Sequence, residues 1–211
     1  MVQVKICGIQ TPQTLSVAAS AGARFVGFVF VPKSPRYVAP EQARLLNLQC
    51  PTGIKSVGLF SNPDDQHLMD VLNITSLDFI QLHGDESPSR VQDIKSKFNI
   101  PVIKAFSIST TGDLKSVLPY ISLIDWILFD AKPPPNSKIT GGNGIPFDWT
   151  ILKEKRFEKP WMLSGGLTPD NIKEALSILT PDAVDVSSGV ESSRGVKDPQ
   201  KITDFIKAIR M

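Results

Sequence analysis

The fold is decided by Trp161-Met162-Leu163-Ser164-Gly165-Gly166-Leu167-Thr168-Pro169, in which an apolar segment runs into a Ser/Gly turn and then a helix-like stretch. The same order returns in Ala183-Val184-Asp185-Val186-Ser187-Ser188-Gly189-Val190. Glycine lets the backbone approach an anion closely, and a following helix N-terminus points free N–H groups at it. A (β/α)8 barrel often builds its phosphate site from the loops after its last two strands. The pair therefore predicts such a barrel, with phosphate bound by Ser164, Gly165, Gly166, Ser187, Ser188 and Gly189.

The rest of the chain repeats an alternation of short apolar runs and amphipathic stretches, which is typical of a parallel sheet covered by helices. The predicted strands cover residues 2–6, 25–30, 54–59, 79–82, 102–106, 126–130, 161–163 and 183–186. The predicted helices cover residues 11–20, 40–48, 64–72, 88–98, 112–118, 149–154, 169–179 and 199–209. No linker long enough to separate domains interrupts this order. We therefore expect an α/β fold, a single-domain (β/α)8 TIM barrel over residues 1–211.

Composition limits the partners of this protein. Of the 211 residues 41% are hydrophobic, and 23 Lys and Arg against 21 Asp and Glu leave a net charge of +2. No segment combines positive charge with aromatic residues as a nucleic-acid surface does. No apolar run reaches membrane-spanning length, and a strand at residues 2–6 leaves no room for a signal peptide. Two cysteines give no disulfide framework. We expect a cytoplasmic protein that binds neither nucleic acid nor membrane.

One long irregular stretch, residues 131–147, follows the sixth predicted strand. It contains three consecutive prolines and then Gly141-Gly142-Asn143-Gly144. Loops of this length inside a compact domain are usually functional or disordered. We interpret this one as a partly mobile lid whose glycine end, Gly142, Asn143 and Gly144, helps to line the phosphate site; a plain surface insertion is the alternative.

The first predicted strand holds the sharpest chemical signal. Alternation places Lys5 and Cys7 on one face, and in a barrel strand that polar face looks inward. A buried lysine is costly unless it has a partner or a function. Cys7 would end the strand where barrel active sites lie, and a neighbouring cation favours its thiolate. Cys7 is therefore a candidate base or nucleophile, although a free cysteine is also a common core residue.

Two aspartates lie at the ends of other predicted strands. Asp130 closes the apolar run at residues 126–129. Apolar surroundings favour a protonated carboxyl group, so Asp130 is a candidate general acid, and the alternative is a cap for the next turn. Asp185 is separated from the second Ser/Gly turn by Val186, so we expect it to orient a neighbouring polar group.

Six motifs occur in a fixed order along residues 2–211: Lys5-Ile6-Cys7-Gly8; Gly27-Phe28-Val29-Phe30 leading to Ser34-Pro35-Arg36; Gln81-Leu82-His83-Gly84-Asp85-Glu86; Gly141-Gly142-Asn143-Gly144 with Phe147-Asp148-Trp149; Leu163-Ser164-Gly165-Gly166-Leu167-Thr168-Pro169; and Asp185-Val186-Ser187-Ser188-Gly189-Val190-Glu191. Together they closely resemble phosphoribosylanthranilate isomerase. One departure is Asn143, where the family commonly has threonine. Backbone N–H groups bind there, so the departure leaves the expected function intact.

The resemblance implies an Amadori rearrangement of a small-molecule substrate, N-(5-phosphoribosyl)anthranilate, in tryptophan biosynthesis. By the family pattern Asp130 is the general acid and Cys7 the general base, and no metal or other cofactor is needed. Arg36 matches an arginine near the anthranilate ring, where a guanidinium can pair with the carboxylate. We also expect contacts to substrate from Lys5, Gln81, His83 and Asp185. Monomer and homodimer both remain open.

Two other functions remain possible from the residues. A sugar-phosphate isomerase of the histidine pathway has a similar barrel and similar chemistry, but is expected to carry an aspartate where this chain has Cys7. A catalytically silent phosphate-binding barrel would not need both Cys7 and Asp130. An aldolase-type barrel needs a Schiff-base lysine near the phosphate site, and neither Lys5 nor Lys104 is suitably placed.

Overall fold

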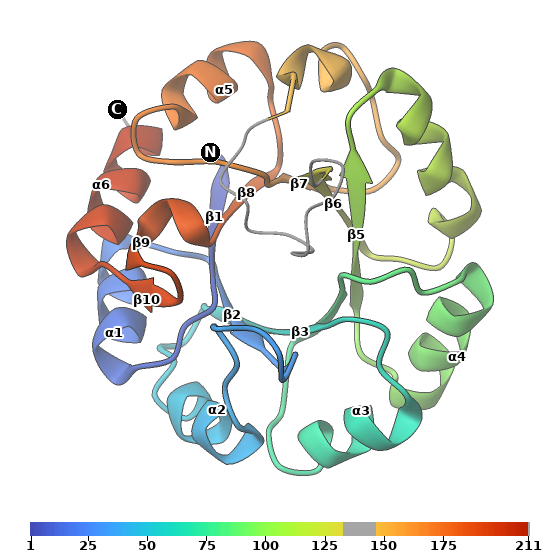
Figure 1. Cartoon of the computed structure of the whole chain (residues 1–211), viewed down its shortest axis with the longest axis vertical. Coiled ribbons are helices and arrows are strands. Elements are labelled where there is room, and N and C mark those ends of the chain that lie inside the picture. Colours follow the sequence, from blue (N-terminus) through green and yellow to red (C-terminus); the bar gives the residue numbers. More distant parts are fainter. Residues whose placement is uncertain (133–146, 211) are drawn as a thin grey trace.

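The computed structural model describes residues 1–132 and 147–210, and it shows a closed barrel of eight parallel strands. Each strand pairs with the next one along the chain, and the last pairs with the first (Figure 1). The strands are β1 (Gln3–Cys7), β2 (Phe25–Val29), β3 (Lys55–Phe60), β4 (Phe79–Leu82), β5 (Val102–Ile108), β6 (Trp126–Ala131), β7 (Trp161–Leu163) and β8 (Ala183–Val186). All eight predicted strands are confirmed.

Helices form the outer ring around this barrel (Figure 1). They are α1 (Pro12–Ala21), α2 (Pro40–Asn47), α3 (Asp65–Leu72), α4 (Pro88–Phe98), η1 (Thr111–Tyr120), η2 (Trp149–Leu152), α5 (Ile172–Ile178), η3 (Ser188–Val190) and α6 (Pro199–Arg210). Proline opens α1, α2 and α4 at a first-turn position, where its missing N–H costs nothing. No helix of residues 1–132 and 147–210 combines the length and apolar character needed to cross a bilayer.

Three predicted helices differ from the structure. The helices η1 and η2 are 3-10 helices; η1 contains Pro119, which cannot donate a backbone hydrogen bond, and η2 has only four residues. The helix predicted from residue 169 begins at Ile172. There Thr168 N donates to Asn171 Oδ1 at 2.8 Å, and Asn171 N donates to Thr168 Oγ1 at 3.3 Å. These local bonds hold residues 168–171 as a turn, because such side chains compete with the helical pattern.

A short antiparallel hairpin, β9 (Glu191–Ser193) with β10 (Val196–Lys197), follows β8 and was not predicted. It lies at the outer edge of the barrel beside α1 and α6 (Figure 1). Strands of two and three residues show no alternation that a sequence pattern can detect. Gly195, with φ +87°, makes the turn, in the left-handed region that favours glycine.

The apolar core has two layers. Val4, Ile6 and the corresponding side chains of the other strands pack outward against the helices, for example against Leu15 and Phe205. A second cluster fills the barrel itself: Phe25, Val57, Ile103, Ala105, Leu128, Met162 and Ala183. Each fully buried large apolar side chain contributes about 1.5–3 kcal/mol.

Aromatic rings close the N-terminal end of the barrel. Phe25, Phe79 and Trp126 are the first residues of β2, β4 and β6. The Phe25 ring meets Phe79 and Trp126 edge to face, with centroids 5.9 and 5.6 Å apart. Contribution of a layer by alternate strands is characteristic of this barrel. The polar inward-facing residues are thereby confined to the C-terminal end.

Candidate active site

Lys5 and Asp185 form a buried ion pair inside the barrel. β1 and β8 pair in a register that places the two residues side by side, and Lys5 Nζ donates to Asp185 Oδ1 at 2.8 Å. Lys5 is fully buried, as the alternation along β1 predicts, and its required partner is Asp185. Ser164 Oγ donates to the second oxygen of Asp185 at 3.3 Å. Asp185 therefore orients both neighbours, the role expected for it.

Cys7 lies one turn of the alternation above Lys5, at the end of β1, and is buried. Burial raises the pKa of its thiol, and although Lys5 opposes this effect, Asp185 adds to it. Burial by itself lowers the pKa of Lys5, but Asp185 and Cys7 outweigh it and the net direction is upward. The expectation that Lys5 makes Cys7 a ready thiolate is thus wrong for the resting protein. The reason is that the charge of Lys5 is already paired with Asp185.

Gly27 makes room for the thiol. A Cβ atom built on Gly27 would stand 3.0 Å from Cys7 Sγ and 3.1 Å from Cys7 Cα. Any other residue at this place on β2 would press on the sulfur, so the neighbouring strand gives Cys7 its space.

Asp130, at the end of β6, accepts two hydrogen bonds. Ala131 N donates to Oδ1 at 2.8 Å, and His83 Nε2 lies 3.1 Å from Oδ2. Nδ1 of the same histidine lies 2.9 Å from Gln81 Nε2, and Gln81 is fully buried. Gln81 and His83 thus share a strand face, as expected, but their polar atoms form a chain that ends on Asp130.

The direction of protons along this chain is tied to the Gln81 amide. With Nε2 of Gln81 facing His83, the imidazole carries its proton on Nε2 and donates to an Asp130 carboxylate. Gln81 Oε1 is then a buried acceptor with no partner among the described residues. A rotated amide would instead accept from Nδ1–H, leaving Nε2 free to accept from a protonated Asp130. Both protonation states of the carboxyl group therefore have a matching arrangement.

The two Ser/Gly turns lie against each other. A Cβ atom on Gly189 would overlap the carbonyl oxygen of Leu167, and one on Gly165 would stand 2.5 Å from Ala131 N. Gly165 also has φ +89°. Ser187 Oγ donates to the carbonyl oxygen of Cys7 at 3.0 Å. We call residues 164–166 and 187–189 the phosphate turns; they adjoin the ends of β1 and β6, next to Cys7 and Asp130.

Two qualifications concern the predicted phosphate site. Only the second of these turns leads directly into a helix, the three-residue η3, whereas α5 begins six residues after Gly166. Any anion binding here therefore depends on the backbone N–H groups of the turns more than on helix ends. Gly142, Asn143 and Gly144 lie outside the described residues. Within the described ranges, no group of three or more His, Cys, Asp and Glu side chains is placed to hold a metal ion.

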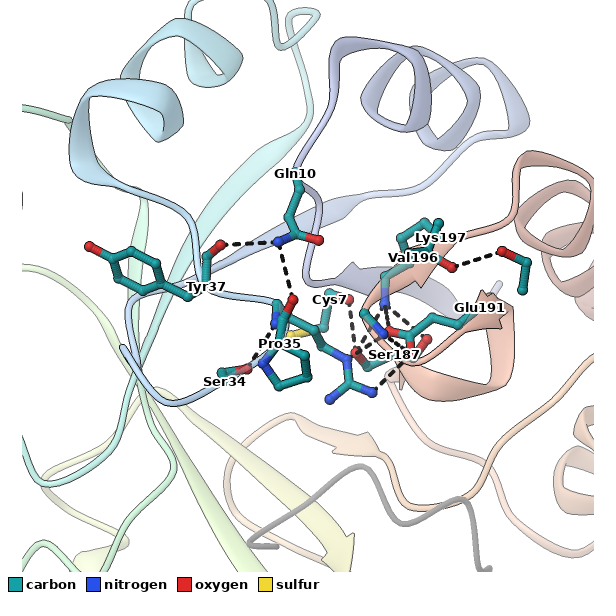
Figure 2. A network of polar contacts seen from close by, with 12 residues as sticks. Cys7, Gln10, Ser34, Pro35, Tyr37, Ser187, Glu191, Val196 and Lys197 are labelled. Atoms are coloured by element: carbon teal, nitrogen blue, oxygen red, sulfur yellow. Dashed lines mark hydrogen bonds and ion pairs between the residues drawn. The ribbon is translucent and has the colours of Figure 1, made fainter.

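Arg36 is held by a residue that sequence reasoning did not single out. Its Nε and Nη2 donate to the two oxygens of Glu191 at 2.7 and 3.0 Å. Lys197 Nζ donates to Glu191 Oε1 at 2.7 Å and to Ser187 Oγ at 3.1 Å (Figure 2). The available signal was two opposite charges flanking Gly195 just after the second phosphate turn.

These contacts have clear electrostatic consequences. Although burial works against it, hydrogen bonds from Arg36 and Lys197 lower the pKa of Glu191 to about 2, and the residue stays ionised. Burial lowers the pKa of Lys197, with Glu191 opposing. With Arg36, the three groups carry one net positive charge when ionised, which favours an anionic ligand at this end of the barrel.

This arrangement is that of a (β/α)8-barrel enzyme that acts by acid–base chemistry on a small anionic substrate. The family model for N-(5'-phosphoribosyl)anthranilate isomerase matches residues 4–208. The chain belongs to this family, as the resemblance of its motifs predicted.

Individual relatives support this membership. The N-(5'-phosphoribosyl)anthranilate isomerase of Paracoccus denitrificans is 50% identical over 205 residues, which cover 97% of this chain and 95% of the relative. The crystal structure of phosphoribosyl anthranilate isomerase from Thermotoga maritima is 39% identical, with a TM-score of 0.89 and coverage of 100% of this chain and 99% of the other. A structure of this isomerase in complex with reduced 1-(o-carboxyphenylamino)-1-deoxyribulose 5-phosphate is 38% identical, with a TM-score of 0.86 and the same coverage.

Proposed function

We propose that Asp130 and Cys7 are the general acid and general base with which this chain isomerises N-(5-phosphoribosyl)anthranilate. The isomerase activity, a step of tryptophan biosynthesis, follows from membership of the family. The roles of the two residues rest on one observation: a carboxyl group with a histidine partner and a buried thiol end two strands of the same barrel, beside both phosphate turns.

The reaction needs two proton transfers on a small sugar. Asp130 donates a proton to the furanose ring oxygen, the C1–O bond breaks, and the anilino nitrogen supplies the electrons for an iminium. Cys7, as the thiolate, removes the proton from C2 and an enolamine forms. Protonation at C1 with loss of the C2 hydroxyl proton gives the aminoketone. Proton donation and acceptance at separate positions require two groups with different environments.

The environment of Cys7 is consistent with this order. Burial holds the resting group as a thiol, and Lys5 is the nearest cation that favours the thiolate. The iminium formed in the first step is a second cation beside the sulfur. An opposite charge within a few ångströms favours the ionised form, so ring opening prepares Cys7 for the second step.

Binding of the substrate divides among three places. The backbone N–H groups of Ser164, Gly165 and Gly166 and of Ser187, Ser188 and Gly189 bind the phosphate, joined by Gly142 to Gly144 as the motif implies. Arg36 pairs with the ring carboxylate. Lys5 and Asp185 act on substrate through Cys7 and Ser164, and Gln81 acts through His83. The protein works in the cytoplasm without nucleic-acid partners, as a monomer or homodimer; one structural relative is described as a dimeric isomerase engineered into monomers.

A fluorescence assay that follows loss of the anthranilate adduct tests this function, with the histidine-pathway aminoaldose as competitor. Turnover of the anthranilate adduct is expected. Activity on the competitor alone would contradict the substrate assignment, and no turnover of either compound would indicate a silent barrel.

A further inference from the structure

Glu191, the first residue of β9, has a carboxylate whose acceptor sites are all occupied. Arg36 Nε and Lys197 Nζ both donate to Oε1 at 2.7 Å. Arg36 Nη2 and Gly195 N donate to Oε2, at 3.0 and 2.9 Å. A carboxylate has about four lone-pair sites, so these four donors fill it. The Glu191 side chain is only 4% exposed, and it therefore holds Arg36 in one place.

The ion pair uses one edge of the guanidinium. Arginine has five N–H donors in a rigid plane, and two adjacent ones on Nε and Nη2 go to Glu191. The edge formed by Nη1 and Nη2 keeps the same fork geometry, which matches a second planar carboxylate in a bidentate pair.

The stem of Arg36 is fixed as well. A Cβ atom on Gly8 would stand 3.0 Å from Arg36 Cδ and 3.2 Å from its Cβ, so the aliphatic part of the arginine lies against the backbone after β1. On the other side, a Cβ atom on Gly195 would stand 2.7 Å from the carbonyl oxygen of Pro35. The hairpin and the β1 loop thus enclose the segment that carries Arg36.

The same hairpin reaches the phosphate turns. Lys197 Nζ donates to Ser187 Oγ and, at 3.0 Å, to its carbonyl oxygen. Ser187 Oγ in turn donates to the carbonyl oxygen of Cys7, and Figure 2 shows these residues grouped together. A continuous chain of polar contacts therefore runs from Arg36 through Glu191 and Lys197 to a phosphate turn.

We propose that Glu191 is a positioning residue that fixes Arg36 for recognition of the ring carboxylate of the substrate. This inference rests on the proposed function, which supplies that carboxylate. A bare carboxylate near Arg36 would weaken anion binding, but Lys197 restores one net positive charge to the cluster. Preorganisation then improves affinity because the arginine loses little side-chain freedom on binding.

The test uses two probes: reduced 1-(o-carboxyphenylamino)-1-deoxyribulose 5-phosphate and the same compound without its ring carboxyl group. Titration calorimetry gives the dissociation constant of each for the parent, Glu191→Gln and Glu86→Gln. Glu86 is the matched control because it is equally buried and pairs with Lys104 at 3.1 Å, in a separate cluster.

Glu191→Gln is expected to weaken the carboxylated probe about tenfold or more, the effect of losing about one charge-assisted hydrogen bond. It should change the probe without the carboxyl group less than about twofold. Glu86→Gln should leave the ratio of the two constants unchanged. Equal loss on both probes, or an unchanged or tighter constant for the carboxylated one, would overturn the inference.

A double-mutant cycle shows whether Glu191 acts through Arg36. In an Arg36→Met background, Glu191→Gln should no longer alter the ratio of the two dissociation constants. A full effect in that background would overturn the positioning role. Failure of the parent to bind either probe would contradict the proposed function itself, whereas a parent that binds both leaves the ratio to decide the inference alone.

Discussion

At the scale of single residues, Asp130 is defined by the histidine behind it. His83 places Nε2 3.1 Å from Asp130 Oδ2 and binds Gln81 through its other nitrogen. The imidazole therefore supports the acid through two fixed hydrogen bonds, and its direct contact with substrate is not needed for this role.

His83→Ala is expected to lower kcat about ten- to a hundredfold with little change in KM, because a charge-assisted hydrogen bond contributes roughly 1.5–3 kcal/mol. Steady-state kinetics measure this. His67→Ala, on α3, is the control and should retain parental kcat. A rise in KM with unchanged kcat would instead make His83 a substrate-binding residue.

The Cys7 thiol should titrate above the ordinary cysteine value, since burial raises its pKa. Thiolate absorbance measured against pH in a Cys50→Ser background tests this. A raised pKa means that the thiolate appears only at more alkaline pH. Lys5→Met should move the titration further upward, because the only nearby effect that Lys5 exerts is to lower this pKa. A titration below the ordinary value in the parent would contradict the account.

At the scale of elements, the strands and the inward side chains were predictable because period-2 alternation decides burial in a barrel strand. Lys5 and Cys7 are examples, and both face the barrel interior. What could not be predicted were partners distant in sequence: Asp185 for Lys5, His83 for Asp130 and Glu191 for Arg36. Such pairs depend on strand register and loop packing, which local patterns do not encode.

The β9–β10 hairpin should contribute to stability in a pH-dependent way. Glu191 has a pKa lowered from 4.5 to about 2, so its contribution is fully present above pH 4.5 and is lost as the pH falls toward 2. The shift corresponds to about 3 kcal/mol. Urea unfolding should show the parent more stable than Glu191→Gln at pH 7, with a gap that narrows below pH 4.5. A gap independent of pH would mean that the charge of Glu191 adds no stability.

At the scale of the whole molecule, the barrel separates stability from chemistry. Aromatic rings of β2, β4 and β6 close the N-terminal end, and the ionisable groups Cys7 and Asp130 end strands at the other. This division is general for the fold, in which residues at the C-terminal ends of strands carry catalysis. Two strands far apart in the chain can therefore supply an acid and a base to one substrate.

The most direct test of this account is the kcat of Cys7→Ser on N-(5-phosphoribosyl)anthranilate, measured on protein that unfolds in urea like the parent. Serine keeps the size of the side chain, but its hydroxyl is far less acidic than a thiol. We predict a kcat lower by about 10² to 10⁴-fold, the usual contribution of general-base catalysis, with KM little changed. A variant with near-parental kcat would contradict the central claim, because the base would then lie elsewhere.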